Sequence, residues 1–81
     1  MNEYNYNDNG NKHGYWEKYY PNGGKLWYKG NYVNGYESGY WEVYYRNGNL
    51  GYKGNYINGE KDGTWEWFYA DGSLSEKVFH L

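Results

Sequence analysis

Residues 39–56 read GYWEVYYRNGNLGYKGNY, two aromatic-rich runs on either side of a central Asn-Gly. The opening of this stretch recurs as GYWEKYY at residues 14–20 and as GTWEWFY at residues 63–69. The first copy begins 25 residues before Gly39, and the third begins 24 residues after it. Self-similarity at a period of about 20–50 residues is typical of repeat architectures. We therefore interpret the chain as an array built from one unit.

The bulk composition indicates one small ordered β domain. The chain has 81 residues and no cysteine, which excludes disulfides and thiolate metal sites. Aromatic residues make up 26% of it, and the net charge is −2, whereas disordered chains have few aromatics and high net charge. We divide residues 1–81 into repeats at about 14–38, 39–62 and 63–81. A partial repeat or N-terminal edge at 1–13 precedes them, with residues 1–7 expected to be frayed or an edge segment.

The central hairpin can be registered from its turn. Asn-Gly between β-type runs is a strong hairpin signal, because both central residues of a type I′ turn need positive φ. We place a two-residue turn at Asn47-Gly48 and count outward. Glutamate then faces lysine, a favourable cross-strand pair, and tryptophan faces a bare glycine. The predicted pairs are Tyr45 with Leu50, Val43 with Tyr52, Glu42 with Lys53, and Trp41 with Gly54.

The flanking copies and the links follow the same count. The third copy turns at Asp71-Gly72, and the first takes up one extra residue in a three-residue loop at 22–24 with a glycine bulge. These turns predict Tyr20–Leu26, Glu17–Lys29 and Trp16–Gly30 in the first copy, and Tyr69–Leu74, Glu66–Lys77 and Trp65–Val78 in the third. The Asn-Gly links at 34–35 and 58–59 predict Gly30–Gly39, Tyr28–Trp41, Gly54–Gly63 and Tyr52–Trp65.

These pairings predict an all-β fold, a single-layer antiparallel β-meander of about six strands made from three hairpin repeats. Side chains alternate across a strand, so the sheet has two faces. One face carries the tryptophans of the repeats with many tyrosines, and we expect it to be the core or a contact surface. The other face carries glutamate and lysine ladders, which are Glu17, Glu42 and Glu66 with Lys29, Lys53 and Lys77.

The repeated pattern resembles a known family. Gly-x-Trp-x-x-Tyr-Tyr-x-Asn-Gly-x-Leu-x-x-Lys-Gly-x-Tyr-x-Asn-Gly-x-x-x-Gly, over roughly residues 8–79, is similar to the MORN-repeat variant of bacterial YwqK-type antitoxin-like proteins. The resemblance implies a single-layer antiparallel β-meander used mostly as an interaction scaffold. Roles proposed for the wider family include protein assembly, dimerisation and membrane-lipid contact. The last copy departs from the pattern at Glu76 and at Val78-Phe79, which we interpret as a capping repeat.

No pattern in the chain predicts catalysis. A glutamate that recurs in every repeat opposite a lysine is read as structural, because a catalytic carboxylate pair is usually singular. His13 and His80 stand alone, without a cluster of metal ligands or a nucleophile. We therefore predict a non-enzyme with no cofactor, no catalytic residue and no metal site. The acidic residues of the links are expected to be solvated turn residues, namely Glu37, Glu60 and Asp62.

The aromatic surface is the predicted functional feature. A single-layer sheet cannot cover both of its faces, and large exposed apolar patches usually mark interaction sites. Tyrosine and tryptophan are also the residues enriched at binding hot spots. We select aromatic positions that break the repeat or lie on the more solvated side. The candidate partner-binding residues are Trp27, Tyr36, Tyr40, Tyr44, Trp67 and Phe68.

We therefore predict a non-enzymatic protein-binding module that presents an aromatic face or an open edge strand to a protein partner. It would act as a small stand-alone inhibitor, either antitoxin-like or from a phage or mobile element, and an edge strand would also permit a homodimer. The alternative is a carbohydrate- or cell-wall-binding aromatic repeat. The slight acidity argues against nucleic acid and against a lipid surface. Residues 1–9 lack the features of a signal peptide, so we expect a cytoplasmic location.

Overall fold

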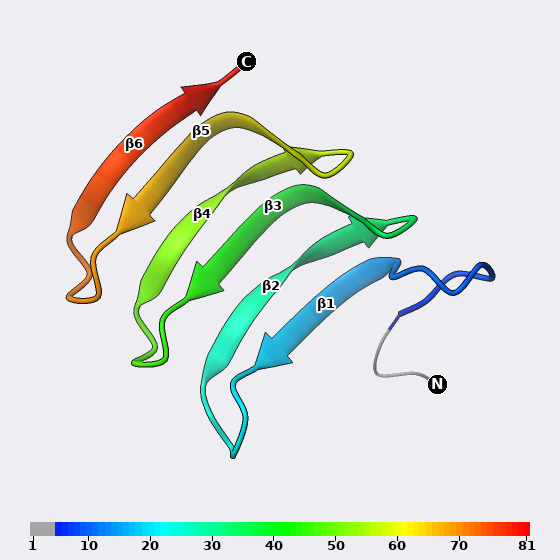
Figure 1. The fold of residues 1–81 in the computed structure, drawn as a ribbon, viewed down its shortest axis with the longest axis horizontal. Coiled ribbons are helices and arrows are strands. Elements are labelled where there is room, and N and C mark those ends of the chain that lie inside the picture. The colour runs from blue at the N-terminus through cyan, green and yellow to red at the C-terminus, as the bar shows by residue number, and fades with distance from the viewer. Residues whose placement is uncertain (1–4) are drawn as a thin grey trace.

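The computed structural model describes residues 5–81 as one six-stranded antiparallel sheet in the order β1-β2-β3-β4-β5-β6 (Figure 1). The predicted single-layer meander is confirmed, and the sheet measures 41 × 37 × 12 Å. Among residues 5–81 there is no helix long and apolar enough to cross a membrane. The strands are β1 (Gly14–Tyr19), β2 (Leu26–Val33), β3 (Tyr36–Tyr44), β4 (Leu50–Ile57), β5 (Glu60–Phe68) and β6 (Leu74–His80).

The turn of the central hairpin is longer than predicted. Tyr45 donates its N–H to the Asn49 carbonyl at 2.8 Å, and Gly48 donates to the Tyr45 carbonyl at 2.9 Å. The loop therefore has three residues, and Gly48 takes the positive φ of 94° that closes such a loop. The Asn47 side chain favours this form, because its carbonyl oxygen accepts from the Asn49 N–H at 2.8 Å.

A bulge then corrects the register of this hairpin. Leu50 lies opposite Tyr44, so the predicted Tyr45–Leu50 pair is wrong. Gly51 is an extra residue on β4 that moves the ladder back by one position. Beyond it the predicted pairs are confirmed, which are Val43 with Tyr52, Glu42 with Lys53, and Trp41 with Gly54.

The outer hairpins repeat this compensation. The predicted pairs Tyr20–Leu26 and Tyr69–Leu74 are wrong, because a longer loop places Leu26 opposite Tyr19 and Leu74 opposite Phe68. The loop of the first copy spans residues 21–24, since Tyr20 donates to the Lys25 carbonyl at 3.0 Å. Trp27 and Ser75 are the extra residues that correspond to Gly51. The remaining predicted pairs are confirmed: Glu17–Lys29, Trp16–Gly30, Glu66–Lys77 and Trp65–Val78.

The links between hairpins, at residues 34–35 and 58–59, are tight turns, and each is followed by a break in the strand pairing. Asn34 and Gly35 have φ of 50° and 87°, and Asn58 and Gly59 have φ of 51° and 82°, as a type I′ turn requires. Past these turns, the register shifts by two residues, because residues 39–41 of β3 lie opposite the single residue Gly30 of β2, and Gly39 has a φ of 74°. Gly63 repeats this irregularity. The predicted pairs Gly30–Gly39, Tyr28–Trp41, Gly54–Gly63 and Tyr52–Trp65 are therefore wrong, because Tyr28 faces Val43 and Tyr52 faces Trp67.

The irregularity lays each indole on the glycine of the preceding repeat. A Cβ built on Gly30 would lie 2.2 Å from the ring of Trp41, and one on Gly54 would lie 2.2 Å from the ring of Trp65. The indole N–H groups donate to carbonyls next to these glycines, at 3.0 Å in both cases. The buried aromatic residues are Trp16, Tyr32, Trp41 and Trp65, with Tyr28 and Tyr56 packed beside the first three.

The segment before β1 completes this pattern with a partial repeat. Tyr6 forms an isolated bridge with Lys12, and its ring meets Trp16 edge-on at 5.4 Å. The Trp16 indole donates to the Asn5 carbonyl at 3.0 Å. Tyr32 meets Trp41 in the same way, edge-on at 5.0 Å. The frayed or edge segment expected at 1–7 falls partly on residues 1–4, which lie outside the described residues.

Hydrogen bonds also join each repeat to the next near the turns. The Tyr20 hydroxyl donates to the Tyr44 carbonyl at 2.6 Å, and the Tyr45 hydroxyl donates to the Phe68 carbonyl. The Lys25 ammonium donates to the Asn47 carbonyl at 3.2 Å. Equivalent positions of successive repeats are therefore held at a fixed spacing by side chains as well as by the ladder.

Candidate binding face

The structure does not gather the six predicted contact residues into one site. Trp27 and Trp67 lie with the tryptophans of the repeats, on a surface that we call the tryptophan face. Trp27 is stacked on Tyr20 at 5.2 Å, and Trp67 lies 6.0 Å from Trp65 between ring centroids. The remaining four were expected in the same contact set.

Those four lie elsewhere on the sheet. Tyr40 and Tyr44 belong to the opposite face, where both hydroxyls donate to the Glu42 carboxylate. Tyr36 is exposed at the start of β3 beside Gly59. Phe68 is half-buried opposite Leu74 at the end of β5.

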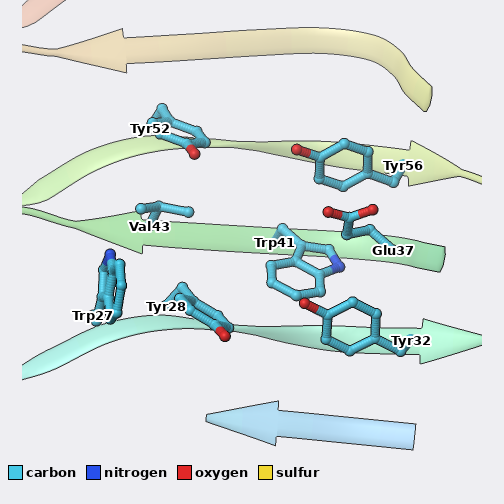
Figure 2. Close-up of a pocket in the computed structure, with 8 residues that line it drawn as sticks. All are labelled: Trp27, Tyr28, Tyr32, Glu37, Trp41, Val43, Tyr52 and Tyr56. Atoms are coloured by element: carbon cyan, nitrogen blue, oxygen red, sulfur yellow. The ribbon is translucent and has the colours of Figure 1, made fainter. Parts of the chain in front are cut away.

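A cavity of about 270 Å³ opens on the tryptophan face over β2, β3 and β4 (Figure 2). Only Trp27 among the predicted contact residues lines it. The other lining residues had been assigned to the predicted core or contact face, except Glu37, which was expected to be a solvated link residue. The lining residues are Trp27, Tyr28, Tyr32, Glu37, Trp41, Val43, Tyr52 and Tyr56.

Aromatic packing builds the walls of this cavity. Tyr28 stacks on Trp41 at 5.6 Å with an interplanar angle of 29°, while Tyr32 and Tyr56 meet the same indole edge-on at 5.0 and 6.1 Å. Trp27 stands across Tyr28 at 5.4 Å and 68°. Trp41 therefore contacts three tyrosines and is buried. Such ring pairs add about 0.5–1.5 kcal/mol each beyond their buried area.

Glu37 supplies the only formal charge among the lining residues. In Figure 2 its carboxylate lies between the Trp41 and Tyr56 side chains. Burial, the neighbouring Tyr52 and the Glu37 charge raise the pKa of Tyr56 to about 12. Burial, Tyr28 and Glu37 raise the pKa of Tyr32 to about 12 as well. The phenols are therefore neutral at physiological pH, and the cavity has a single negative group at its edge.

The opposite face is organised around the repeated glutamates. Burial alone would raise the pKa of the Glu42 carboxyl, but hydrogen bonds from Tyr44 and Tyr40 and the nearby Lys29 hold that pKa below its usual value. The Lys29 ammonium lies 3.4 Å from the Glu42 carboxylate. Glu17 accepts from two tyrosines in the same way. A pattern that recurs in successive repeats indicates a structural ladder.

The bulges hide the cavity from simple register counting. Tyr28 and Tyr52 were expected on this face, but the shift of two residues at the links places them opposite Val43 and Trp67 instead of Trp41 and Trp65. A signal for Glu37 does exist in the sequence. The position four residues before each repeat tryptophan is Lys12, Glu37 or Lys61, so the middle copy alone reverses the charge.

An open, single-layer array of β-hairpins with a recurrent Gly-x-Trp start defines a class of repeat scaffold. A family model described as MORN repeat variant matches residues 12–34, 37–58 and 61–80, and the chain belongs to this family. Comparison with curated proteins and with solved structures finds no match. MORN repeats are generally non-enzymatic modules that are associated with binding to proteins or membranes.

Proposed function

We propose that this chain is a non-enzymatic protein-binding module whose contact surface is the tryptophan face. The observation that carries the proposal is the uncovered cavity over Trp41 in a sheet only 12 Å thick. No second layer of residues 5–81 packs on this face. Rigid aromatic side chains around a shallow hollow are the usual anchors of protein interfaces.

More specifically, we propose that the protein is a small stand-alone inhibitor that acts by covering a surface of another protein. Two features support it. Its recurring charged residues are engaged in structural ladders rather than in a catalytic arrangement. The rings that line the cavity are locked by mutual packing, which reduces the entropy lost on binding. We place in the contact both Trp27, which lines the cavity, and Trp67, which lies beside Trp65 on the same face.

The test is quantitative binding of a partner identified by affinity capture from the native host. Trp27→Ala is expected to weaken that binding by at least about tenfold, or about 1.4 kcal/mol, as for an interface hot spot. Trp27 is 37% exposed and lies at a bulge where the other repeats carry Gly51 and Ser75, so its loss is tolerated by the fold.

Phe79→Ala is the matched control, because Phe79 is 66% exposed and lies on β6, away from the cavity. Its binding should match that of the unaltered chain. Equal binding by the Trp27→Ala chain would contradict the proposal. Retention on a polysaccharide matrix that is competed by soluble sugar, with no protein partner, would instead support the carbohydrate-binding alternative.

A further inference from the structure

Two of the repeat tryptophans carry the ammonium group of the lysine that lies four residues before them in the sequence. The Lys12 ammonium lies 5.0 Å from the centroid of the Trp16 ring and 5.1 Å from that of Tyr32. The Lys61 ammonium lies 5.3 Å from the Trp65 ring. Both lysines stand four residues before their tryptophan. The fold thus places an ammonium group over the indole of the first and third repeats, where cation–π attraction holds it.

The middle repeat keeps the rings and reverses the charge. Trp41 and Tyr56 meet edge-on at 6.1 Å and 88°, much as Trp16 and Tyr32 meet at 5.8 Å and 81°. The residue four before Trp41 is Glu37, whose carboxylate lies between these two side chains in Figure 2. Within residues 5–81, no lysine or arginine is placed over Trp41.

We propose that the notch between Trp41 and Tyr56, with Glu37 beside it, binds an organic ammonium group from outside the chain. The rings attract a cation through their negative faces, and the carboxylate adds a Coulombic attraction that the other two repeats lack. Trp41, Tyr56 and Glu37 all line the cavity of about 270 Å³, so a group that enters the cavity meets all three. The middle repeat would thus bind an ammonium group from another molecule at the position that Lys12 and Lys61 occupy in the outer repeats.

The chemistry is shared by a lysine side chain of a protein and by a free alkylammonium compound. This site does not depend on the proposed function, because it follows from the charge reversal at Glu37 rather than from the exposed tryptophans. A lysine source would nevertheless connect the two, since the lysine would enter from a partner protein that covers the tryptophan face.

The experiment is a titration of the folded chain followed by nuclear magnetic resonance, reading the indole N–H signal of Trp41. The probes are tetramethylammonium and N-acetyl-lysine methylamide, and the control is tert-butanol, which has a similar shape but no charge. A saturable shift with either ammonium probe and none with tert-butanol is expected. An equal response to tert-butanol, or no saturable shift with either cation, would overturn the proposal.

Two substitutions test the carboxylate. Glu37→Gln keeps the size of the side chain and is expected to weaken ammonium binding by about tenfold, equivalent to about 1.4 kcal/mol. Glu60→Gln is the matched control, because it removes the same charge from an exposed position outside the cavity and should leave binding unchanged. Equal affinities of the Glu37→Gln chain and the unaltered chain would contradict the assignment.

Glu37→Lys is an independent test, because it fills the proposed site with an ammonium group from the chain itself. The introduced ammonium is expected to lie over Trp41 as Lys12 and Lys61 lie over their tryptophans, which abolishes external binding without lowering the melting temperature. If this variant still binds tetramethylammonium as tightly as the unaltered chain, the notch is not the site. Tighter binding of the lysine analogue identifies a protein side chain as the source, and tighter binding of tetramethylammonium identifies a free alkylammonium compound.

Discussion

Gly54 has no room for a side chain, because the indole of Trp65 lies directly on it. A methyl group there would come 2.2 Å from the ring, and Trp65 is 0% exposed, so the ring has no solvent into which it can move. We expect Gly54→Ala to lower the free energy of unfolding by about 1–3 kcal/mol, the usual cost of overpacking. Chemical denaturation measures this loss.

Gly51→Ala is the control for this residue, because the first and third repeats carry Trp27 and Ser75 at the same bulge. Its Cβ would lie 3.1 Å from the Val43 carbonyl oxygen and 3.6 Å from the Tyr45 ring, with no indole against it, and we expect a smaller loss than for Gly54→Ala. Similar losses in both variants would show that backbone entropy, rather than contact with the indole, sets the requirement for glycine.

Sequence counting foresaw that the indole of Trp41 would meet a glycine but assigned the wrong one. Trp41 does pair with Gly54 across its own hairpin, yet its ring lies on Gly30 of the preceding repeat. Ladder partners can be counted from turn signals, whereas the lean of a side chain depends on the bulge beside it. Gly39, with its positive φ of 74°, is where that lean is set.

At the scale of the elements, the same dipeptide makes two different turns. Asn58-Gly59 forms a two-residue turn with both φ values positive, whereas Asn47-Gly48 belongs to a three-residue loop in which only Gly48 has positive φ. The difference follows from the neighbours, since the Asn47 side chain also donates to the Ala70 carbonyl of the next repeat at 2.9 Å. That contact is long-range and cannot be inferred from the dipeptide.

The φ of 51° at Asn58 gives a testable cost. Left-handed backbone costs an ordinary L-residue about 1–2 kcal/mol, and asparagine and glycine tolerate it best. We therefore expect Asn58→Ala to destabilise the chain by about 1 kcal/mol and Asn58→Gly to change stability by only a few tenths. Thermal unfolding of the two variants side by side makes the comparison, and equal melting temperatures would exclude a turn strained for alanine.

At the scale of the whole molecule, tyrosines on both faces make the stability of the fold decrease at high pH. Burial is the main cause that raises the pKa of Tyr15 and Tyr44 on one face, and of Tyr32 and Tyr56 on the other, to about 12. Unfolded tyrosines ionise near pH 10. Because the folded state holds these protons more tightly, the stability they contribute is complete below pH 10 and is lost as pH rises towards 12.

We expect the free energy of unfolding, measured in urea, to be insensitive to tyrosine ionisation up to about pH 9 and to fall steadily above about pH 10. Absorbance of the phenolate measures the same transition directly. A chain that ionises its tyrosines near pH 10 without any loss of stability would show that the buried hydroxyls are not held in their neutral form.

The fold as a whole could be predicted from the sequence, because each repeat contains residues that fix how its strands pair. Glu42 with Lys53 and the tight turn at Asn34-Gly35 were both predicted and are both confirmed. The cavity was not readable, because its residues come from three strands whose offset is set by two kinds of bulge. Glu37 was detectable only by comparing the three copies with one another.

The hydrogen bonds that join equivalent positions of successive repeats fix the distance from one repeat to the next. Tyr20 to Tyr44 and Tyr45 to Phe68 are the same bond, translated by one unit. Duplication of residues 39–62 would therefore insert two strands and lengthen the sheet by about 10 Å without changing the surroundings of the flanking units. Gene duplication could therefore change the distance between the two ends of such an array in equal steps. Each added unit would also add one tryptophan, with either a lysine or a glutamate four residues before it.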